Sequence, residues 1–453
     1  MRGLNLKTLG AALAVAVASG PALAETLTDA LVTSYRNSGL IAQNRAVLRA
    51  ADEDVAQAVA TLRPALSYAL GADYNDPSFG DELTGALSVT ANMLLYDFGR
   101  SQLAIEAAKE TVLATRAALV DIENTILLNT VTAYMNVRRS EAFVNLRQNN
   151  VRLLTEQLRA TRDRFEVGEV TRTDVSLAEA RLAAARSGLA AEQGGLARAQ
   201  EQYKAVVGQY PGRLAPPPSP PAIPGSEAAA RDIARAENPQ IRQVQHQVKA
   251  VELVVEQAAR GMYPSLNASG RVAVDDDGDD SLSLGLDLTG PIYQGGAIAS
   301  RQRQAQAQKD QVRAQLYTTG LLVDQQVGNA YANLAVAVAS IDASERQVRA
   351  AQLALEGVRE ELQLGARTTL EVLDQEQELL DAQTTRVAAE VDRYLAVYQV
   401  LDATGLLTAE RLGLNVPIYD PAAYYNAVKD APGHLVSPEG KRLDRVLRAL
   451  GKE

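Results

Sequence analysis

The chain has 453 residues, with 45 Lys and Arg against 55 Asp and Glu, so its formal net charge is −10. This acidic balance argues against nucleic-acid binding, which selects basic surfaces. The chain has no cysteine and only two histidines, His246 and His434, which are far apart in sequence. We therefore expect no disulfide, no metal site built on Cys or His, no cofactor and no enzymatic activity.

Residues 1–24 have the pattern of a secretory signal peptide. Arg2 and Lys7 form a basic start, an apolar run follows from Leu9 to Ala18, and Ala22-Leu23-Ala24 precedes Glu25 as a cleavage site. A retained anchor is the alternative, but the run is too short to span a bilayer as a helix. We predict an exported protein. No later segment has about 20 uninterrupted apolar residues, so any membrane contact would be made by strands.

Residues 25–413 are predicted to form two repeats, residues 25–209 and 226–413, joined by a proline-rich linker at 210–225. Three pairs of segments share one offset of 197 residues (293 − 96) without an insertion. They are Leu95–Gly99 with Ile292–Gly296, Ala133–Asn136 with Ala330–Asn333, and Val167–Val175 with Leu364–Val372. Because loops tolerate length changes, this constancy predicts long helices whose ends must lie level.

Each repeat is predicted to begin with a helix, over Thr28 to Thr61 and over Glu227 to Arg260. Two strands follow, in which apolar residues alternate with small or polar ones. The strands run from Leu66 to Tyr74, Leu87 to Leu95, Leu266 to Val274 and Leu282 to Leu288. Period two indicates one apolar face. A half-buried sheet in a soluble protein is the alternative, but the strands have the length of membrane strands, and no helix is apolar enough to cover them.

Four strands cannot close a barrel, and lipid does not tolerate open sheet edges, so the chain must associate with copies of itself. Two copies would give a filled eight-stranded barrel, whereas three would give twelve strands around a water-filled lumen. The small polar residues of the inward face favour three copies.

Long helices are predicted after each strand pair. The spans from Gly99 to Gly168 and from Gly296 to Gly365 are both 69 residues (168 − 99 and 365 − 296), which is roughly 100 Å of helix. Helices of this length must pack as coiled coils. A tight turn at each second glycine leads into another long helix, so that a hollow helical tube is expected beside the barrel.

These features together resemble the TolC-type outer-membrane channel-tunnel family over residues 25–413. The matching motifs are the strand entries at Pro64 and Pro264, the strand exits at Tyr96 and Tyr293, and the turns Phe165–Val170 and Leu362–Arg367. The resemblance implies a homotrimer with a 12-stranded barrel in outer-membrane lipid, four strands per chain, continuous with an α-helical coiled-coil tunnel in the periplasm. It also implies docking to a periplasmic adaptor (membrane fusion) protein and an inner-membrane transporter of the ABC, RND or MFS type.

The resemblance further assigns functions to residues at the ends of the helical hairpins. The adaptor would dock at Val167, Gly168 and Glu169 and at Leu364, Gly365 and Ala366, although the glycines could serve only the turns. Arg367 matches the gate arginine of the family, and Asp174 matches its carboxylate partner. Glu371 and Asp374, on one face of a helix, would ring the narrow end with carboxylates and favour cations, unless that face is merely solvated. At the repeat offset, Arg367 and Asp374 correspond to the uncharged Val170 and Leu177, so we expect the second repeat to carry the gate.

The predicted function is a passive exit duct for type I protein secretion, small-molecule efflux or both. The amino-acid sequence of Leu288–Gly296 and the expected lack of a lipid anchor favour the secretion branch of the family. A periplasmic coiled-coil scaffold or adaptor without a pore is the alternative, which the four alternating strands disfavour. The acidic segment Asp275–Asp280 is interpreted as a solvated outer loop rather than a calcium site, because its spacing does not fit an EF-hand. Residues 414–453 are expected to wrap the waist of the tunnel.

Overall fold

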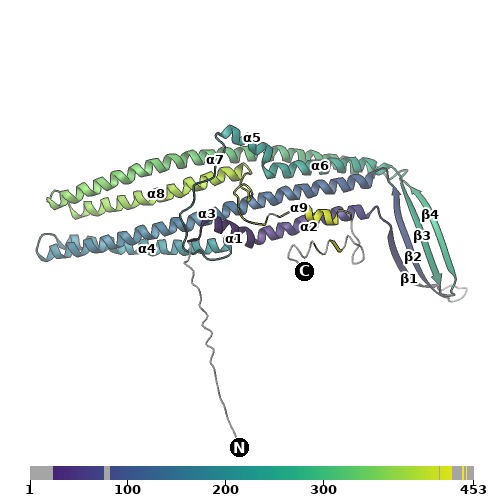
Figure 1. Cartoon of the computed structure of the whole chain (residues 1–453), viewed down its shortest axis with the longest axis horizontal. Coiled ribbons are helices and arrows are strands. Elements are labelled where there is room, and N and C mark those ends of the chain that lie inside the picture. The colour runs from purple at the N-terminus through teal and green to yellow at the C-terminus, as the bar shows by residue number, and fades with distance from the viewer. Residues whose placement is uncertain (1–23, 76–81, 418, 431–440, 443–444, 446–453) are drawn as a thin grey trace, which may run out of the picture.

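A computed structural model describes residues 24–75, 82–417, 419–430, 441–442 and 445. Residues 1–23 of the predicted signal peptide lie outside the described part. The chain is an elongated bundle of helices with a sheet at one end and the tips of two helical hairpins at the other (Figure 1).

The sheet has four antiparallel strands in the order β1-β2-β3-β4. They are β1 Ala65–Asn75, β2 Glu82–Tyr96, β3 Ser265–Asp275 and β4 Asp280–Thr289. The register places Tyr68, Val89, Val272 and Leu282 in one row across the sheet. The row beside it, on the opposite face, is Ser67, Thr90, Arg271 and Ser283. The predicted apolar face is therefore continuous over all four strands, and its leucines on β4 are 68–80% exposed in the single chain.

Strands β1 and β4 form the two edges of this sheet. Unpaired edges expose backbone donors and acceptors, which cannot be satisfied in lipid. The sheet is therefore complete only when β1 of one chain pairs with β4 of another, as the predicted trimeric barrel requires.

Two helices of identical length leave the sheet. They are α3, Arg100–Glu166, and α7, Ala297–Gln363, each of 67 residues, or roughly 100 Å. Each is preceded by a glycine with positive φ, +77° at Gly99 and +86° at Gly296, which turns the chain from strand into helix at little steric cost. Return helices α4, Arg172–Val207, and α8, Thr369–Ala403, pack against the far halves of α3 and α7.

The prediction of one continuous helix at the start of each repeat is wrong, because each of these segments forms two helices. They are α1 Leu27–Asn37 and α2 Gly39–Ala60 in the first repeat, and α5 Glu227–Glu237 and α6 Pro239–Ala259 in the second. The chain leaves helical geometry at Ser38 and Asn238, whose side chains cap the following helix. Asn238 precedes a proline, which disfavours the helical conformation there. The break lets α2 and α6 lie along those halves of α3 and α7 that are nearer the sheet (Figure 1).

The offset between repeats changes at the sheet. It is 200 residues for α1 and α5 (227 − 27) and 197 for α3 and α7 (297 − 100). The difference of three residues arises between the first strand and the long helix of each repeat, a span of 35 residues from Ala65 to Arg100 and of 32 from Ser265 to Ala297 (100 − 65 and 297 − 265). Part of it is the connection between the strands, residues 76–81 in the first repeat and 276–279 in the second. The helical part of the two repeats therefore keeps a constant length, whereas the outer loops do not.

The largest buried cluster lies at the waist, where α1, α3, α4, α8 and the segment after α8 meet. Tyr134 of α3 is fully buried there, and its hydroxyl donates to the carbonyl of Ala215 at 2.7 Å. Tyr331, its counterpart on α7, donates to the carbonyl of Pro224 at 2.7 Å. Both carbonyls belong to the proline-rich linker, so the second of the three repeated segments holds the linker against the two long helices.

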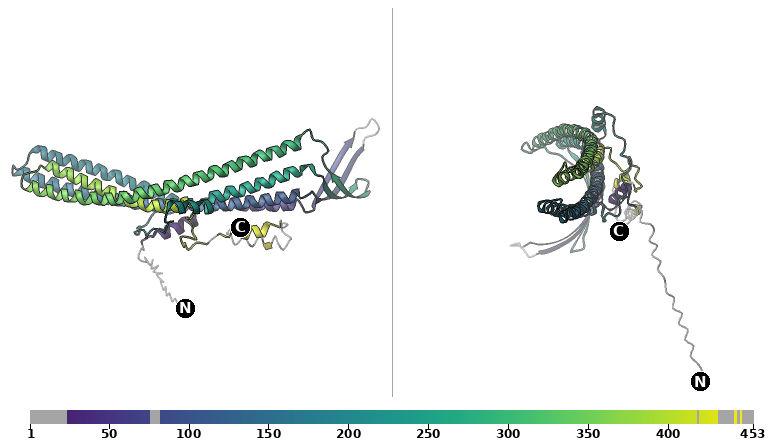
Figure 2. Two further views of the ribbon diagram at one scale, coloured as in Figure 1. Left: turned by 90° about the horizontal axis from the view of Figure 1, so that it is seen from above. Right: turned by 90° about the vertical axis from the view of Figure 1, so that its left-hand side faces the viewer.

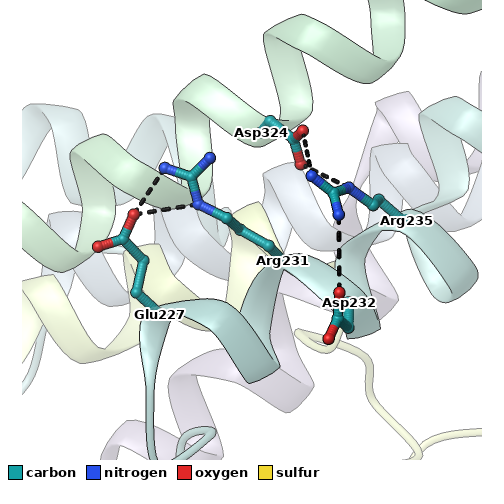
Figure 3. Close-up of polar contacts among 5 residues, drawn as sticks. All are labelled: Glu227, Arg231, Asp232, Arg235 and Asp324. Atoms are coloured by element: carbon teal, nitrogen blue, oxygen red, sulfur yellow. Dashed lines mark hydrogen bonds and ion pairs between the residues drawn. The ribbon is translucent and has the colours of Figure 1, made fainter.

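Helix α5 is attached to α7 by charged groups. Arg235 donates to both carboxylate oxygens of Asp324, at 3.1 and 2.8 Å, and Arg231 pairs with Glu227 at 2.6 Å (Figure 3). Asp232 lies 3.6 Å from Arg235. Helix α5 also packs on α7 through two buried alanines, Ala230 and Ala234. The equivalent helix α1 is held by larger apolar side chains in the waist cluster. The two repeats thus share a backbone plan but differ in how their waist helices are fixed.

A short helix, α9 Pro421–Val428, packs on α2. The Tyr424 hydroxyl donates to Glu53 at 2.5 Å, and Arg116 of α3 donates to the carbonyl of Pro421 at 3.2 Å. Most of the tail beyond residue 430 lies outside the described residues.

Seen from the tips, the helices form a curved wall that is open on one side (Figure 2). Such a wall encloses a lumen only when several copies complete the circle. Within the described residues, no helix combines the length and the apolar character needed to cross a membrane.

Candidate functional site

The two hairpin tips are built alike. In the first, Gly168 has a φ of +79°, its amide donates to the carbonyl of Phe165 at 3.0 Å, and the amide of Glu169 donates to Arg164 at 2.9 Å. Such bonds satisfy the last carbonyls of α3 and stop the helix. Nothing lies within 4 Å of a Cβ placed on Gly168, so positive φ rather than space requires glycine there.

The second tip repeats this arrangement at the same offset. Gly365 has a φ of +75°, its amide donates to Leu362 at 3.0 Å, and the amide of Ala366 donates to Glu361 at 2.9 Å. Val167 and Leu364, the residues before the two glycines, are 72% and 84% exposed. Each hairpin therefore ends in a hydrogen-bonded turn that presents an apolar side chain to solvent beside its glycine.

Asp174 and Glu371 have a role at these tips that sequence reasoning missed. Asp174 accepts from the amide and hydroxyl of Thr171, at 2.9 and 2.8 Å. Glu371 accepts from the same groups of Thr368, at 2.8 and 2.9 Å. Each threonine in turn caps its helix, so both pairs are capping boxes, 197 residues apart. The signal was present in the sequence, as threonine followed three residues later by an acid at the start of a helix.

Arg367 is bound within its own hairpin. Its Nε lies 2.7 Å from Oε2 of Glu361, and its Nη1 lies 2.9 Å from Oε1 of Glu371. Two hydrogen bonds hold the pKa of Glu371 below its usual range. The larger effect comes from the backbone amide of Thr368 and the next from the side chain of Arg367. Within the described residues of the single chain, Asp174 makes no ion pair with Arg367. The predicted gate pair is thus not brought together inside one chain.

Asp374 contacts the other hairpin of its own chain. Its Oδ1 lies 2.5 Å from Nη2 of Arg181 on α4, and both side chains are about half exposed. The predicted aperture carboxylates therefore have different partners, Arg367 for Glu371 and Arg181 for Asp374. This arginine was not singled out from the sequence, because nothing in the local pattern indicates which residue of α4 faces α8.

The acidic segment after β3 forms a tight turn. The amide of Asp279 donates to the Asp275 carboxylate at 2.7 Å, and Gly278 has a φ of +84°. Across the described residues, no three or more His, Cys, Asp or Glu side chains gather in a way that could hold a metal ion.

Comparisons with known proteins agree with this architecture. The sequence profile of the outer membrane efflux protein family (OEP) matches residues 32–209 and 230–406. The outer membrane efflux protein BepC of Brucella suis biovar 1 is 36% identical over 432 residues, which cover 93% of this chain and 94% of BepC. The outer membrane protein TolC of Escherichia coli is 25% identical over 410 residues, 83% of this chain and 81% of TolC.

Solved structures show the same fold. The CmeC outer membrane channel of Campylobacter jejuni superposes with a TM-score of 0.77 at 14% identity, covering 90% of each chain. The fold and the two hairpins define an outer-membrane channel-tunnel that extends into the periplasm. The chain belongs to the outer membrane efflux protein family, and the resemblance to TolC-type channels is confirmed. It is an outer-membrane export channel.

Proposed function

We propose that this channel is the passive exit duct of a tripartite export system, joined at its hairpin tips by a periplasmic adaptor and, through it, by an inner-membrane ABC, RND or MFS transporter. The energy for export would come from these partners, and we infer no enzymatic activity for the chain itself. The observation that carries the proposal is the pair of matched tips, each with an exposed apolar side chain beside a glycine turn.

The proposed docking surface is Val167, Gly168 and Glu169 with Leu364, Gly365 and Ala366. Exposed apolar groups on a turn already fixed by backbone hydrogen bonds lose less conformational entropy when a partner covers them. The equal lengths of α3 and α7 support simultaneous contact by both tips, because they end at the same level below the barrel.

The proposed gate lies at the same end of the molecule. Arg367 and Asp174 would meet between hairpins of the closed assembly, and Glu371 and Asp374 would line the aperture.

We also propose a domain organisation for the whole chain. Residues 25–209 and 226–413 act as two equivalent units joined by residues 210–225. Residues 414–453 form an equatorial tail, and residues 1–24 are the export signal.

The cargo is proposed to be proteins of type I secretion, small molecules or both. BepC carries the word efflux in its name, whereas a more distant relative, AprF of Pseudomonas aeruginosa, is named an alkaline protease secretion protein. The duct is shared by both kinds of cargo, since the inner-membrane partner would select the substrate.

The docking proposal is tested by Leu364→Glu and Val167→Glu, introduced into a strain that lacks the chromosomal copy. Drug tolerance and the secreted proteome would be measured together. We expect at least a tenfold loss of export, because a carboxylate buried under an apolar partner is strongly disfavoured, while chemical cross-linking still shows trimers.

Val167→Leu and Leu364→Val are the matched controls, since they give each tip the apolar residue of the other and add no charge. They should retain both trimers and most export. Full export by both glutamate variants would contradict docking at the tips.

A further inference from the structure

The waist contains a cavity of about 320 Å³ between α1, α2, α3 and the segment that follows α8. Helices α1 and α9 lie on the convex, outer side of the curved helical wall (Figure 2). The cavity is therefore outside the path of exported cargo. Its volume is in the range of sites that hold small organic molecules.

Much of the cavity wall is apolar or aromatic. The side chains of this kind come from α1, α2, α3 and the tail, and they are Tyr35, Ile41, Leu119, Val120, Tyr419 and Pro421. A surface of this composition favours a flat, apolar body over a hydrated inorganic ion.

Two arginines of the wall have donors that nothing in the protein satisfies. The guanidinium carbon of Arg45 lies 5.7 and 4.9 Å from the ring centroids of Tyr35 and Tyr419, and that of Arg116 lies 5.4 Å from the ring centroid of Tyr425. The Nε of each arginine and the hydroxyl of Tyr419 are buried without a hydrogen-bond partner. Within the described residues, neither arginine is in an ion pair. Buried donors left in this state are costly, so the cavity favours a molecule that brings acceptors.

The acidic side chains of the same wall do not supply these acceptors. Oε1 of Glu123 accepts from the backbone amide of Ala409 at 2.5 Å, and burial raises the pKa of this carboxyl. Glu410, the other acidic residue of the wall, is exposed to solvent. The arginines and the tyrosine hydroxyl therefore remain free to bind an anionic group.

We propose that this waist cavity binds a small aromatic carboxylate. The carboxylate accepts from Arg45, Arg116 and the Tyr419 hydroxyl, and the ring lies against the apolar wall. A carboxylate suits these groups because it is negatively charged and offers about four lone-pair positions. A bound molecule joins α1, α2 and α3 to the tail, so it stabilises the waist of the folded chain.

The test titrates 2-naphthoate into the purified full-length trimer in nonionic detergent. Binding is followed by the fluorescence of naphthoate, which no tryptophan obscures because the chain has none. We expect saturable binding at one site per chain and a higher melting temperature. The neutral isostere 2-naphthamide should bind about tenfold more weakly, because it cannot form charge-assisted bonds with both arginines.

Three variants test the assigned side chains. Arg45→Gln and Arg116→Gln should each weaken naphthoate binding by about tenfold or more. Tyr419→Phe should weaken it by roughly threefold or more and leave the melting temperature of the ligand-free trimer unchanged, since this hydroxyl has no partner in the protein. Arg152→Gln is the matched control, because Arg152 is an exposed arginine of the same helix as Arg116 and lies outside the cavity wall. It should bind naphthoate as the wild type does.

Three results would overturn the proposal. Absence of saturable binding would show that the cavity holds only water. Equal affinity for naphthoate and naphthamide would remove the arginines from recognition. Unchanged affinity in Arg45→Gln, Arg116→Gln and Tyr419→Phe alike would place the bound molecule elsewhere on the trimer.

Discussion

At the scale of single residues, the carboxylates at the tips stabilise the starts of the return helices, in addition to the role proposed for them in the gate. Glu371 closes a capping box and binds Arg367, and Asp174 closes the equivalent box in the first repeat. An alanine at either position would therefore remove a cap and a charge together. Glutamine in place of Glu371 keeps the capping-box pattern while removing the charge, so it separates the two effects.

A second residue with an unusual environment is Asp52 of α2. It is fully buried, and neither carboxylate oxygen has a hydrogen-bond partner among the described residues. Burial raises its pKa from 3.8 to about 6, although the nearby charge of Arg116 opposes this. Between these two pH values the folded protein holds a proton that the unfolded chain has released, so the stability contributed by this group falls as the pH rises.

We predict that Asp52→Asn raises the thermal stability of the detergent-solubilised trimer at pH 8, by up to about 3 kcal/mol in free energy of unfolding at one pKa unit per 1.36 kcal/mol. The gain should shrink as the pH falls through these two values and vanish below about pH 3, where both states hold the proton. Melting temperatures measured from about pH 3 to pH 8 would show this. Asp54→Asn, at an exposed position of the same helix, is the control and should leave the pH profile unchanged. A pH-independent gain in Asp52→Asn would contradict the prediction.

At the scale of elements, the return helices α4 and α8 begin in the same way. Thr171 and Thr368 accept from the amides of Asp174 and Glu371 and bind the carboxylates of the same residues. These caps satisfy backbone donors that would otherwise be free at the first turn of each helix. They also fix the direction in which the chain leaves the tip.

We predict that Thr171→Ala and Thr368→Ala each destabilise the first turn of their helix by about 0.5–2 kcal/mol. Hydrogen exchange of amides in that turn should become faster by the corresponding factor, while exchange at the waist stays unchanged. Thr→Ser replacements at the same positions keep the hydroxyl and serve as controls. Unchanged exchange at the tips in the alanine variants would show that the boxes do not hold the helix starts.

At the scale of the whole molecule, the equal lengths of α3 and α7 are the constraint that the repeat preserves. Insertion of one heptad into both α7 and α8, at the same level of this hairpin alone, would move its tip roughly 10 Å farther from the sheet than that of α3 and α4. We predict that such a channel loses export although the barrel and waist assemble. The matched control inserts one heptad into all four of α3, α4, α7 and α8, which keeps the tips level. Export that survives the insertion into one hairpin would show that level tips are not required.

The sequence by itself determined the repeat, the strands, the long helices and the tip glycines. Alternation with period two, the constant offset and glycines at turn positions can be recognised in the sequence without knowledge of how the helices pack. It also placed Asp174, Arg367, Glu371 and Asp374 at the tips. The breaks at Ser38 and Asn238 also have local signals in the sequence, a capping residue at the first and an Asn-Pro pair at the second.

Only the tertiary structure decided which of these residues meet. The partner of Asp374 is Arg181, 193 positions away, and Leu373 packs among residues of two other helices. In a helix, the rotation that selects a contacting residue depends on how neighbouring helices cross, and a pattern of mostly small apolar residues leaves that rotation open. For the same reason the sequence predicted that a gate lies at the tips but not which pair joins the hairpins of one chain.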